Sequence, residues 1–490
     1  MTKTIVPDKT TQTIDSSNRS KSPSGIAYLI VIGVLGASIV LMFFGGAGPE
    51  LVGVFGLVTV LALIILGVPV AIALVAGGLL GLWSLAGLRS VPALLMEAPF
   101  VAASSWSLSV LPMFILMGLV MWRSGISEKI FETARAWVGQ LPGGLAAATN
   151  LSGAGLAAAS GSSLGISYAL GRIAIPEMLR VGYKPSISTA VVVVAGTLGQ
   201  LIPPSVVLVV YAGVAGTPVG PQLIASIIPA VLLALAYTAM ILIRSKINPA
   251  LAPPTGESYS WSARFVSLKH LLPVVVIVVG VLGSMLAGIA TATEAGALGA
   301  LLAIVFTFLR DFKKAPAAIG RAMLDSISAI AAILFLIVGV GILNRMIAMS
   351  GITQTIGDFV TSLGLGKVGF LLLLGLIILL LGTVMDPMAL ILLSVPVLSP
   401  VLAEMNVDMI WFGVFLVILA ELAVVTPPVG VNAFVVHRLA QDPQVNLGQN
   451  VSIRDVFVGA LWFVVISLLM AIVLIFVPEL ALWLPGVSAS

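Results

Sequence analysis

The residues best suited to chemistry lie at four points where helix-breaking residues interrupt long apolar stretches of the sequence. Non-helical backbone at membrane depth is tolerated only where protein buries it or where it lines a polar cavity. Proline pairs remove backbone donors and free upstream carbonyls. Freed carbonyls and Ser or Thr hydroxyls are hard oxygen ligands that suit Na⁺, and helix N-termini at the same place suit a carboxylate. The four breaks are 160–163, 196–205, 382–387 and 426–432.

The candidate ion- and substrate-binding residues are those at or beside the breaks: Gly161, Ser162, Ser163, Thr197, Gly199, Pro203, Ser205, Thr383, Asp386, Thr426, Pro427, Gly430 and Asn432. A simpler interpretation is that these small residues and prolines only permit close helix packing. Four breaks in a paired arrangement favour a binding site over packing alone. Charge inside a membrane is costly and usually functional, so Asp386 is the best single candidate.

Three further charged residues have two interpretations each. Glu421 lies five residues before Thr426 and either braces the broken helix or takes part in coupling. Glu294 follows Thr293 at the start of a predicted span, so it either belongs to a capped helix start or has a functional role in the membrane. Arg172 either binds an anion or extends to the membrane surface.

The composition places these breaks in a membrane protein. Of the 490 residues, 60% are hydrophobic and 9% are charged, with a mean hydropathy of +1.20. A soluble domain is about a quarter charged, so a soluble enzyme is excluded. The net charge of +4 fits basic residues held on the cytoplasmic side better than nucleic-acid binding. With no Cys and two His, no thiolate or histidine metal site is expected, and no cofactor beyond a coupling ion.

The elements that must position the breaks are membrane-spanning helices of about 20 residues. Two apolar stretches, 145–181 and 368–405, are too long for one span and are broken near the middle, so each is predicted to be a re-entrant hairpin. Full spans are predicted at about 26–45, 51–66, 68–87, 106–122, 187–215, 221–243, 270–290, 293–309, 322–343, 408–436 and 455–484.

The distribution of Lys and Arg supports this threading. With the N-terminus inside, 20 of the 23 basic residues fall on the cytoplasmic side, and only Arg89, Arg345 and Lys367 fall outside. Reading either hairpin as one full span would move every later loop across the membrane and remove the bias. The sequence therefore predicts a cytoplasmic N-terminus, a periplasmic C-terminus and an inner-membrane location.

The chain divides into a disordered cytoplasmic tail (1–25), an extra N-terminal span (26–45), scaffold spans with a first repeat (46–243), a cytoplasmic linker (244–269) and a second repeat (270–490). Ser124-Gly125-Ile126 recurs as Ser350-Gly351-Ile352, and the proline pair at 203–204 recurs at 427–428. The predicted fold class is all-α integral membrane, with two inverted-topology repeats that each hold a re-entrant hairpin and a broken helix. Amphipathic segments at 127–138 and 352–363 are either ordinary connecting helices or helices with a mechanical role.

Read in order, these motifs resemble a known family over about residues 51–484. The runs are Ser124-Gly-Ile to Leu141-Pro-Gly-Gly144, Ser160-Gly-Ser-Ser163, Ala169-Leu-Gly171, Ile175-Pro-Glu-Met178, Gly196-Thr-Leu-Gly199, Ile202-Pro-Pro-Ser205, Thr293-Glu-Ala295, Met385-Asp386 and Thr426-Pro-Pro-Val-Gly430. Their order and spacing are similar to the large membrane subunit of tripartite ATP-independent periplasmic (TRAP) transporters.

The resemblance implies an elevator-type, Na⁺-coupled importer of a small organic acid such as a C4-dicarboxylate or a sugar acid. It implies two partners, a small membrane subunit of about four spans and a periplasmic binding protein. The family's ion sites carry over to Ser162, Ser163, Thr197, Ser205, Asp386 and Thr426, and the Na⁺ candidates among these are Ser162, Ser163, Thr197, Asp386 and Thr426.

Two departures stand out. Ile166 occupies a position where the family often has Asp, so one acidic contact is lost at the first hairpin. The span at 26–45 lies upstream of the family's usual start and resembles the helix that joins the two membrane subunits in fused versions. No small subunit is found in the sequence, so a separate one is implied.

Three alternatives remain open to test. A binding-protein-independent carboxylate transporter would share the hairpins. A channel would need a set of pore helices that the sequence does not show. An intramembrane enzyme would need a catalytic pair, and Asp386 is the one hairpin-tip acid.

Overall fold

The computed structural model describes residues 25–46, 48–256, 258–427 and 430–488, and these are helical with no strand among them. The predicted all-α class is confirmed. The predicted disordered tail lies, apart from Gly25, outside the described residues. The extra N-terminal span is the helix α1 (Gly25–Phe44).

The helices of the first half run along the chain in the order of the predicted spans. They are α1, α2 (Pro49–Ile65), α3 (Val70–Ala86), α4 (Ser90–Ser104), the 3₁₀ turn η2 (Trp106–Leu108), α5 (Leu111–Arg123), α6 (Ile126–Val138), α7 (Gly144–Ser160), α8 (Ser163–Arg180), α9 (Pro185–Leu201), α10 (Val206–Ala215), α11 (Val219–Ala225) and α12 (Ile227–Ile247).

The second half begins after the segment that follows α12. Its helices are α13 (Trp261–Ser267), η3 (Leu268–His270), α14 (Leu272–Val278), the π-helical turn η4 (Val279–Gly283), α15 (Ser284–Leu286), α16 (Ala292–Arg310), α17 (Ala315–Ser350), α18 (Ile352–Ser362), α19 (Lys367–Gly382), α20 (Pro387–Glu404), α21 (Met409–Ala423), α22 (Val431–Leu439), α23 (Pro443–Asn446), α24 (Ile453–Phe476) and α25 (Glu479–Ser488).

Fewer helices meet the length of a membrane span than the eleven full spans that the sequence predicts. By length and composition, the described residues contain five such helices, or seven if two bent pairs each count as one span. The difference arises because turns and prolines shorten the helices. The span predicted at 106–122, for example, becomes the 13-residue helix α5, which starts at Leu111 after the η2 turn. Thirteen residues rise about 20 Å.

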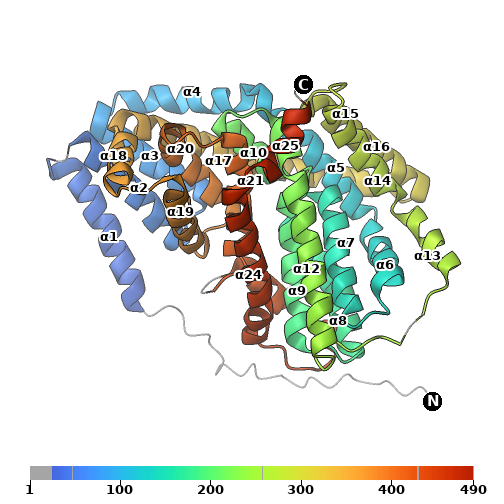
Figure 1. Ribbon diagram of the computed structural model, residues 1–490. Coiled ribbons are helices and arrows are strands. Elements are labelled where there is room, and N and C mark those ends of the chain that lie inside the picture. Colours follow the sequence, from blue (N-terminus) through green and yellow to red (C-terminus); the bar gives the residue numbers. More distant parts are fainter. Residues whose placement is uncertain (1–24, 47, 257, 428–429, 489–490) are drawn as a thin grey trace, which may run out of the picture.

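Two segments of the chain have a different secondary structure from the predicted one. No helix is predicted between 87 and 106, yet α4 fills this segment and lies along one edge of the molecule in Figure 1. The span predicted at 270–290 consists of α14, η4 and α15, with a five-residue π-helical stretch in its middle. Gly280 and Gly283 in that stretch provide the backbone freedom that favours an irregular helix.

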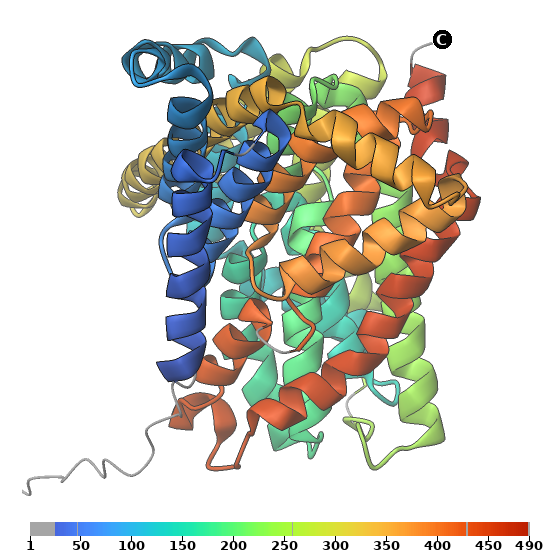
Figure 2. The same ribbon diagram turned by 90° about the vertical axis from the view of Figure 1, so that its left-hand side faces the viewer.

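The long helix α17, with 36 residues, organises one side of the molecule. It packs against α2, α3, α4, α5 and α16. Gly78 on α3 allows a close approach, because a Cβ there would lie 2.9 Å from Ile342 and 3.0 Å from the Leu343 nitrogen on α17. Small residues serve the same purpose where membrane helices pack closely. Figure 2 shows α1 at one side of this group and α24 and α25 at the other.

The segments predicted to be cytoplasmic lie together in the structure. The connecting bonds are Arg123 to Asp325, Arg135 to Glu177 at 3.1 Å, Trp137 Nε1 to Arg264 O at 3.2 Å, and Lys184 N to Leu251 O at 3.0 Å. They join the ends of α5 and α8, the helix α6 and the segments around α13 and α17. These bonds therefore bring several of the basic segments of the sequence together.

Candidate functional site

The first predicted hairpin consists of α7 and α8, which meet at Gly161 and Ser162. Gly161 ends α7 with a left-handed conformation (φ +60°), which favours glycine. Ser162 begins α8 as its cap, and its Oγ accepts a hydrogen bond from the Gly165 nitrogen at 3.3 Å. Sequence-local chemistry thus turns the chain at the predicted tip.

The first predicted broken helix consists of α9 and α10, whose axes differ by 42°. Ser205 caps α10, because its Oγ accepts a hydrogen bond from the Leu208 nitrogen at 3.3 Å and donates to the Gln200 carbonyl. Pro203 is buried within the break and has no N–H to continue the ladder of α9.

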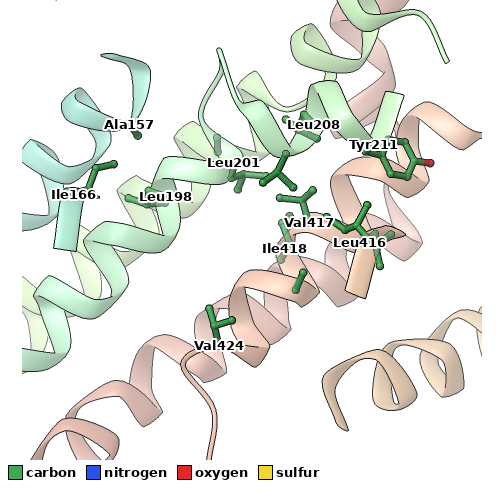
Figure 3. Close-up of a cluster of buried hydrophobic side chains, with 14 of the residues drawn as sticks. Ala157, Ile166, Leu198, Leu201, Leu208, Tyr211, Leu416, Val417, Ile418 and Val424 are labelled. Atoms are coloured by element: carbon green, nitrogen blue, oxygen red, sulfur yellow. The ribbon is translucent and has the colours of Figure 1, made fainter. Parts of the chain in front are cut away.

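The hairpin tip lies directly against this break. A Cβ on Gly161 would lie 3.1 Å from the Pro204 carbonyl oxygen, and a Cβ on Gly199 would lie 3.3 Å from the Ser162 carbonyl oxygen. Figure 3 shows the apolar surroundings, with Ala157 and Ile166 of the hairpin near Leu198 of α9. The two glycines therefore permit a backbone-to-backbone approach that a side chain would prevent.

The second broken helix consists of α21 and α22 and also contacts the first hairpin. Gly430 precedes α22 in a left-handed conformation (φ +55°), and Pro428 and Val429 lie outside the described residues. On α21, the buried Glu421 carboxylate accepts a hydrogen bond from Ser163 Oγ at 3.2 Å. On α22, the buried Asn432 Nδ2 donates to the Val193 carbonyl of α9 at 2.8 Å.

The second hairpin tip lies between α19 and α20. Asp386 caps α20, and its Oδ1 accepts hydrogen bonds from the nitrogens of Met388 at 3.0 Å and Ala389 at 3.1 Å. Thr383 is buried beside it. A Cβ on Gly382 would lie 2.5 Å from the Ala423 Cβ, so this tip adjoins the end of α21. Within the described residues, no hydrogen bond joins Asp386 or Thr383 to the first hairpin.

The candidate hydroxyls are arranged so that their oxygens can accept a cation. Thr197 donates its proton to the Val194 carbonyl, Thr383 donates to Leu380 and Thr426 donates to Leu422, at 2.7–2.8 Å. Each proton is therefore used within its own helix, and the lone pairs of each oxygen stay available. Pro427, beside Thr426, is exposed.

Among the residues that the structure describes, two buried side-chain oxygens at the breaks have no hydrogen-bond partner, Gln200 Oε1 and Asn432 Oδ1. An unpaired buried acceptor costs about 1–3 kcal/mol, so native proteins usually supply a partner. Asn432 is among the site residues predicted from the sequence, and Gln200 is not. The signal for Gln200 was its position, since it is an amide within the Gly196–Ser205 run of an otherwise apolar helix.

A small cavity of about 10 Å³ lies at this junction, between Thr197, Glu421 and Tyr237. This volume holds about one water-sized particle. The described residues contain no group of three His, Cys, Asp or Glu side chains that could hold a metal ion. The junction thus offers mainly neutral oxygen ligands, which suit a monovalent cation better than a transition metal.

We expect Gly196→Ala to lower stability by about 1–3 kcal/mol, because over-packing a tight site forces neighbours to shift. A Cβ there would lie 1.9 Å from Ser167 Oγ and 2.7 Å from the Ser163 carbonyl oxygen. Thermal unfolding of the purified protein measures the effect. Gly341→Ala on α17, where nothing lies within 4 Å, is the matched control and should not lower the melting temperature. Equal melting temperatures for the two variants would contradict this packing.

A family model and several known proteins match most of this chain. The model of the family described as "Tripartite ATP-independent periplasmic transporter, DctM component" matches residues 57–480. The C4-dicarboxylate TRAP transporter large permease protein DctM of Pseudomonas aeruginosa is 34% identical over 389 residues, which cover 79% of this chain and 88% of that protein. The isethionate TRAP transporter permease protein DctMQ of Oleidesulfovibrio alaskensis is 28% identical, over 80% of this chain and 60% of that protein.

One solved structure shares the fold. The crystal structure of the Alcanivorax borkumensis YdaH transporter, described as having an unusual topology, matches with a TM-score of 0.62 over 88% of this chain and 98% of that chain, at 16% identity. Together with the apolar helices, the family match makes this chain a multi-pass inner-membrane transporter component and not an enzyme. The chain belongs to the DctM family, the large permease components of tripartite ATP-independent periplasmic transporters.

Proposed function

We propose that this chain imports a small organic acid by Na⁺-coupled secondary transport. One observation carries the proposal: the first hairpin tip and two broken helices meet around unpaired buried oxygens. Ser163 bonds Glu421 across 258 residues of sequence, and Asn432 bonds Val193 across 239. Na⁺ needs several oxygens and little fixed charge, and the threonine hydroxyls are such neutral ligands, while the unpaired amide oxygens of Gln200 and Asn432 add to the polar character of the region.

We assign the Na⁺ ligands to Ser162, Ser163, Thr197, Asp386 and Thr426. Ser162, Ser163 and Thr197 belong to the first hairpin and to α9, against which it packs. Thr426 follows α21, and Asp386 belongs to the second hairpin tip beside α21. The caps of α8 and α20 also direct positive helix ends toward the tips, which favours a carboxylate substrate there. The relatives named for C4-dicarboxylates and isethionate support an organic anion as substrate.

The proposed transport movement is of the elevator type, with α6 and α18 as the arms between a fixed and a moving part. Each arm follows a glycine in the left-handed region, Gly125 at φ +73° and Gly351 at φ +70°. The preceding serines, Ser124 and Ser350, each donate to the carbonyl three residues earlier, at 2.6 and 2.9 Å. The same local turn at both positions supports the proposed inverted repeat and two equivalent hinges.

The proposed partners are a small membrane subunit of about four spans and a periplasmic binding protein. One relative, the isethionate permease DctMQ, has both M and Q in its name, and this chain covers 60% of its length. This supports a second membrane part as partner. The exposed apolar side chains of α1, such as Leu29 and Ile30, offer a surface within the bilayer for that subunit.

The proposed orientation has residues 1–25 and 244–269 in the cytoplasm and the C-terminus in the periplasm. Alkaline phosphatase folds only outside the cytoplasm, so a fusion after Ser490 is expected to be active, whereas a fusion within 248–256 is expected to be inactive. A cytoplasmic reporter at the same two positions is the control. An inactive phosphatase after Ser490 together with an active cytoplasmic reporter would reverse the assignment.

Uptake by the complete complex in liposomes tests the proposed function. An inward Na⁺ gradient is expected to drive radiolabelled dicarboxylate above its external concentration, and collapse of the gradient should stop accumulation. The channel alternative predicts that substrate only equilibrates. Accumulation that is equal in Na⁺ and in K⁺ would contradict Na⁺ coupling.

A further inference from the structure

We propose that an anionic phospholipid binds at the junction of α5 and α6, with its phosphate in a basic cavity and one acyl chain in an adjoining apolar cavity. The basic cavity has a volume of about 540 Å³ and is lined by Trp122, Arg123, Lys313, Lys314 and Arg321. It lies where the end of α5 meets the start of α17.

The charges of this cavity leave two cations without a carboxylate partner. Arg123 pairs with Asp325, and Lys314 lies 3.5 Å from Asp311. Within the part of the chain that the structure describes, Lys313 and Arg321 have no ion pair, and both are exposed. The first turn of α17 also lines the cavity through Ala317 and Ala318, so the positive end of a 36-residue helix faces the same space. These groups suit a phosphodiester.

The apolar cavity begins on the other side of Trp122. It has a volume of about 210 Å³ and is lined by α5 and α6 on one side and by the first hairpin on the other, including Leu156, Ser162 and Ile166. Trp122 lines both cavities and is 39% exposed. A molecule with an anionic head and an apolar tail fits the two adjoining spaces together, whereas a free phosphate uses only the basic one. Basic pockets between membrane helices are typical sites for phospholipid heads.

The position of the lipid also predicts an effect on the proposed transport movement. Ile126 and Ser127 of the arm helix α6 and the tip residue Ser162 line the same apolar cavity. An acyl chain there fills the space between the proposed hinge at Gly125 and the hairpin, and so acts on the part that would have to move.

Lipid binding to the purified full chain in detergent tests the proposal by native mass spectrometry. Phosphatidylglycerol is expected to bind and phosphatidylcholine is not. Each basic residue near an anionic lipid contributes about 1 kcal/mol, so Lys313→Gln with Arg321→Gln is expected to weaken binding roughly thirtyfold. Lys246→Gln with Arg454→Gln removes two exposed cations that do not line the cavity and should leave binding unchanged. Equal losses in both double variants would overturn the proposal.

The tail is tested with phosphatidylglycerol whose acyl chains are brominated, since bromine quenches tryptophan fluorescence on contact. At limiting lipid, quenching is expected to be largely lost in Trp122→Phe and retained in Trp483→Phe, whose side chain is 60% exposed on α25. Quenching that survives in Trp122→Phe would exclude this tail site. Displacement of the lipid by an equal concentration of inorganic phosphate would assign the basic cavity to a free anion instead.

Discussion

Replacing Asp386 with alanine is expected to raise the Na⁺ concentration for half-maximal uptake at least about tenfold, whereas Asp408→Ala leaves it unchanged. The two residues have the same local role. Asp386 Oδ1 accepts from the nitrogens of Met388 and Ala389, and Asp408 Oδ1 accepts from those of Ile410 and Trp411. Both side chains are exposed, and both variants lose a cap worth about 1 kcal/mol of helix stability.

Position distinguishes the two caps. Asp386 lies at the second hairpin tip, and within the described residues its Oδ2 has no hydrogen-bond partner, so Oδ2 can bind a cation while Oδ1 caps α20. A tenfold change in half-saturation corresponds to about 1.4 kcal/mol of ion binding. Uptake is measured over a range of Na⁺ concentrations at constant ionic strength. A parallel shift in both variants would assign the effect to helix capping and would remove Asp386 from the ion site.

Thr426→Val serves as the companion variant, because valine keeps the shape of threonine and removes the oxygen. The hydroxyl proton already bonds the Leu422 carbonyl, so the fold loses one intrahelical bond only. We expect a smaller rise in half-saturating Na⁺ than for Asp386→Ala, since a neutral ligand is lost instead of a charged one.

The breaks could be predicted from the sequence because each depends on its own residues. Gly161 ends a helix by its left-handed conformation, Ser162 and Ser205 cap the next helix, and Pro203 removes a donor. These effects act within a few residues, so residue type and order predict them. The same local rules fail for α4. Pro92 and Pro99 argue against a helix in this segment. Pro92 nevertheless lies in the first turn of α4, where a missing backbone N–H costs little.

The contacts between the breaks could not be predicted in the same way. The predicted repeats pair each hairpin with one broken helix. In the structure, the first tip contacts both, through Pro204 and through Glu421, while the second adjoins Ala423. Glu421 had two interpretations from sequence, a brace or a coupling residue. Its bond to Ser163 depends on how helices far apart in sequence pack, which no local pattern encodes.

We also expect that this chain, reconstituted with its small subunit under an inward Na⁺ gradient, transports nothing above background until the cognate binding protein is added. The sequence places three basic residues, Arg89, Arg345 and Lys367, on the side predicted to be periplasmic, so few cations there could gather an anionic substrate directly. Arg345 lines a cavity of about 470 Å³ together with Glu97, and Lys367 donates to the Asn406 carbonyl at 2.8 Å. Arg89 precedes α4 on the same side of the predicted topology.

A soluble receptor compensates for the scarcity of cations on this side, because it captures the anion and presents it at the hairpin tips. Peripheral charges of this kind set the rate and orientation of docking more than its affinity. Arg89→Gln is therefore expected to slow receptor-dependent uptake and to weaken its dependence on salt, with accumulation at equilibrium unchanged. A binding protein from an unrelated transporter is the control for the dependence on the cognate binding protein, and its addition should leave uptake at background. Robust Na⁺-driven uptake in the absence of any binding protein would instead assign the chain to direct, receptor-independent transport, with the hairpin tips taking the anion straight from the periplasm.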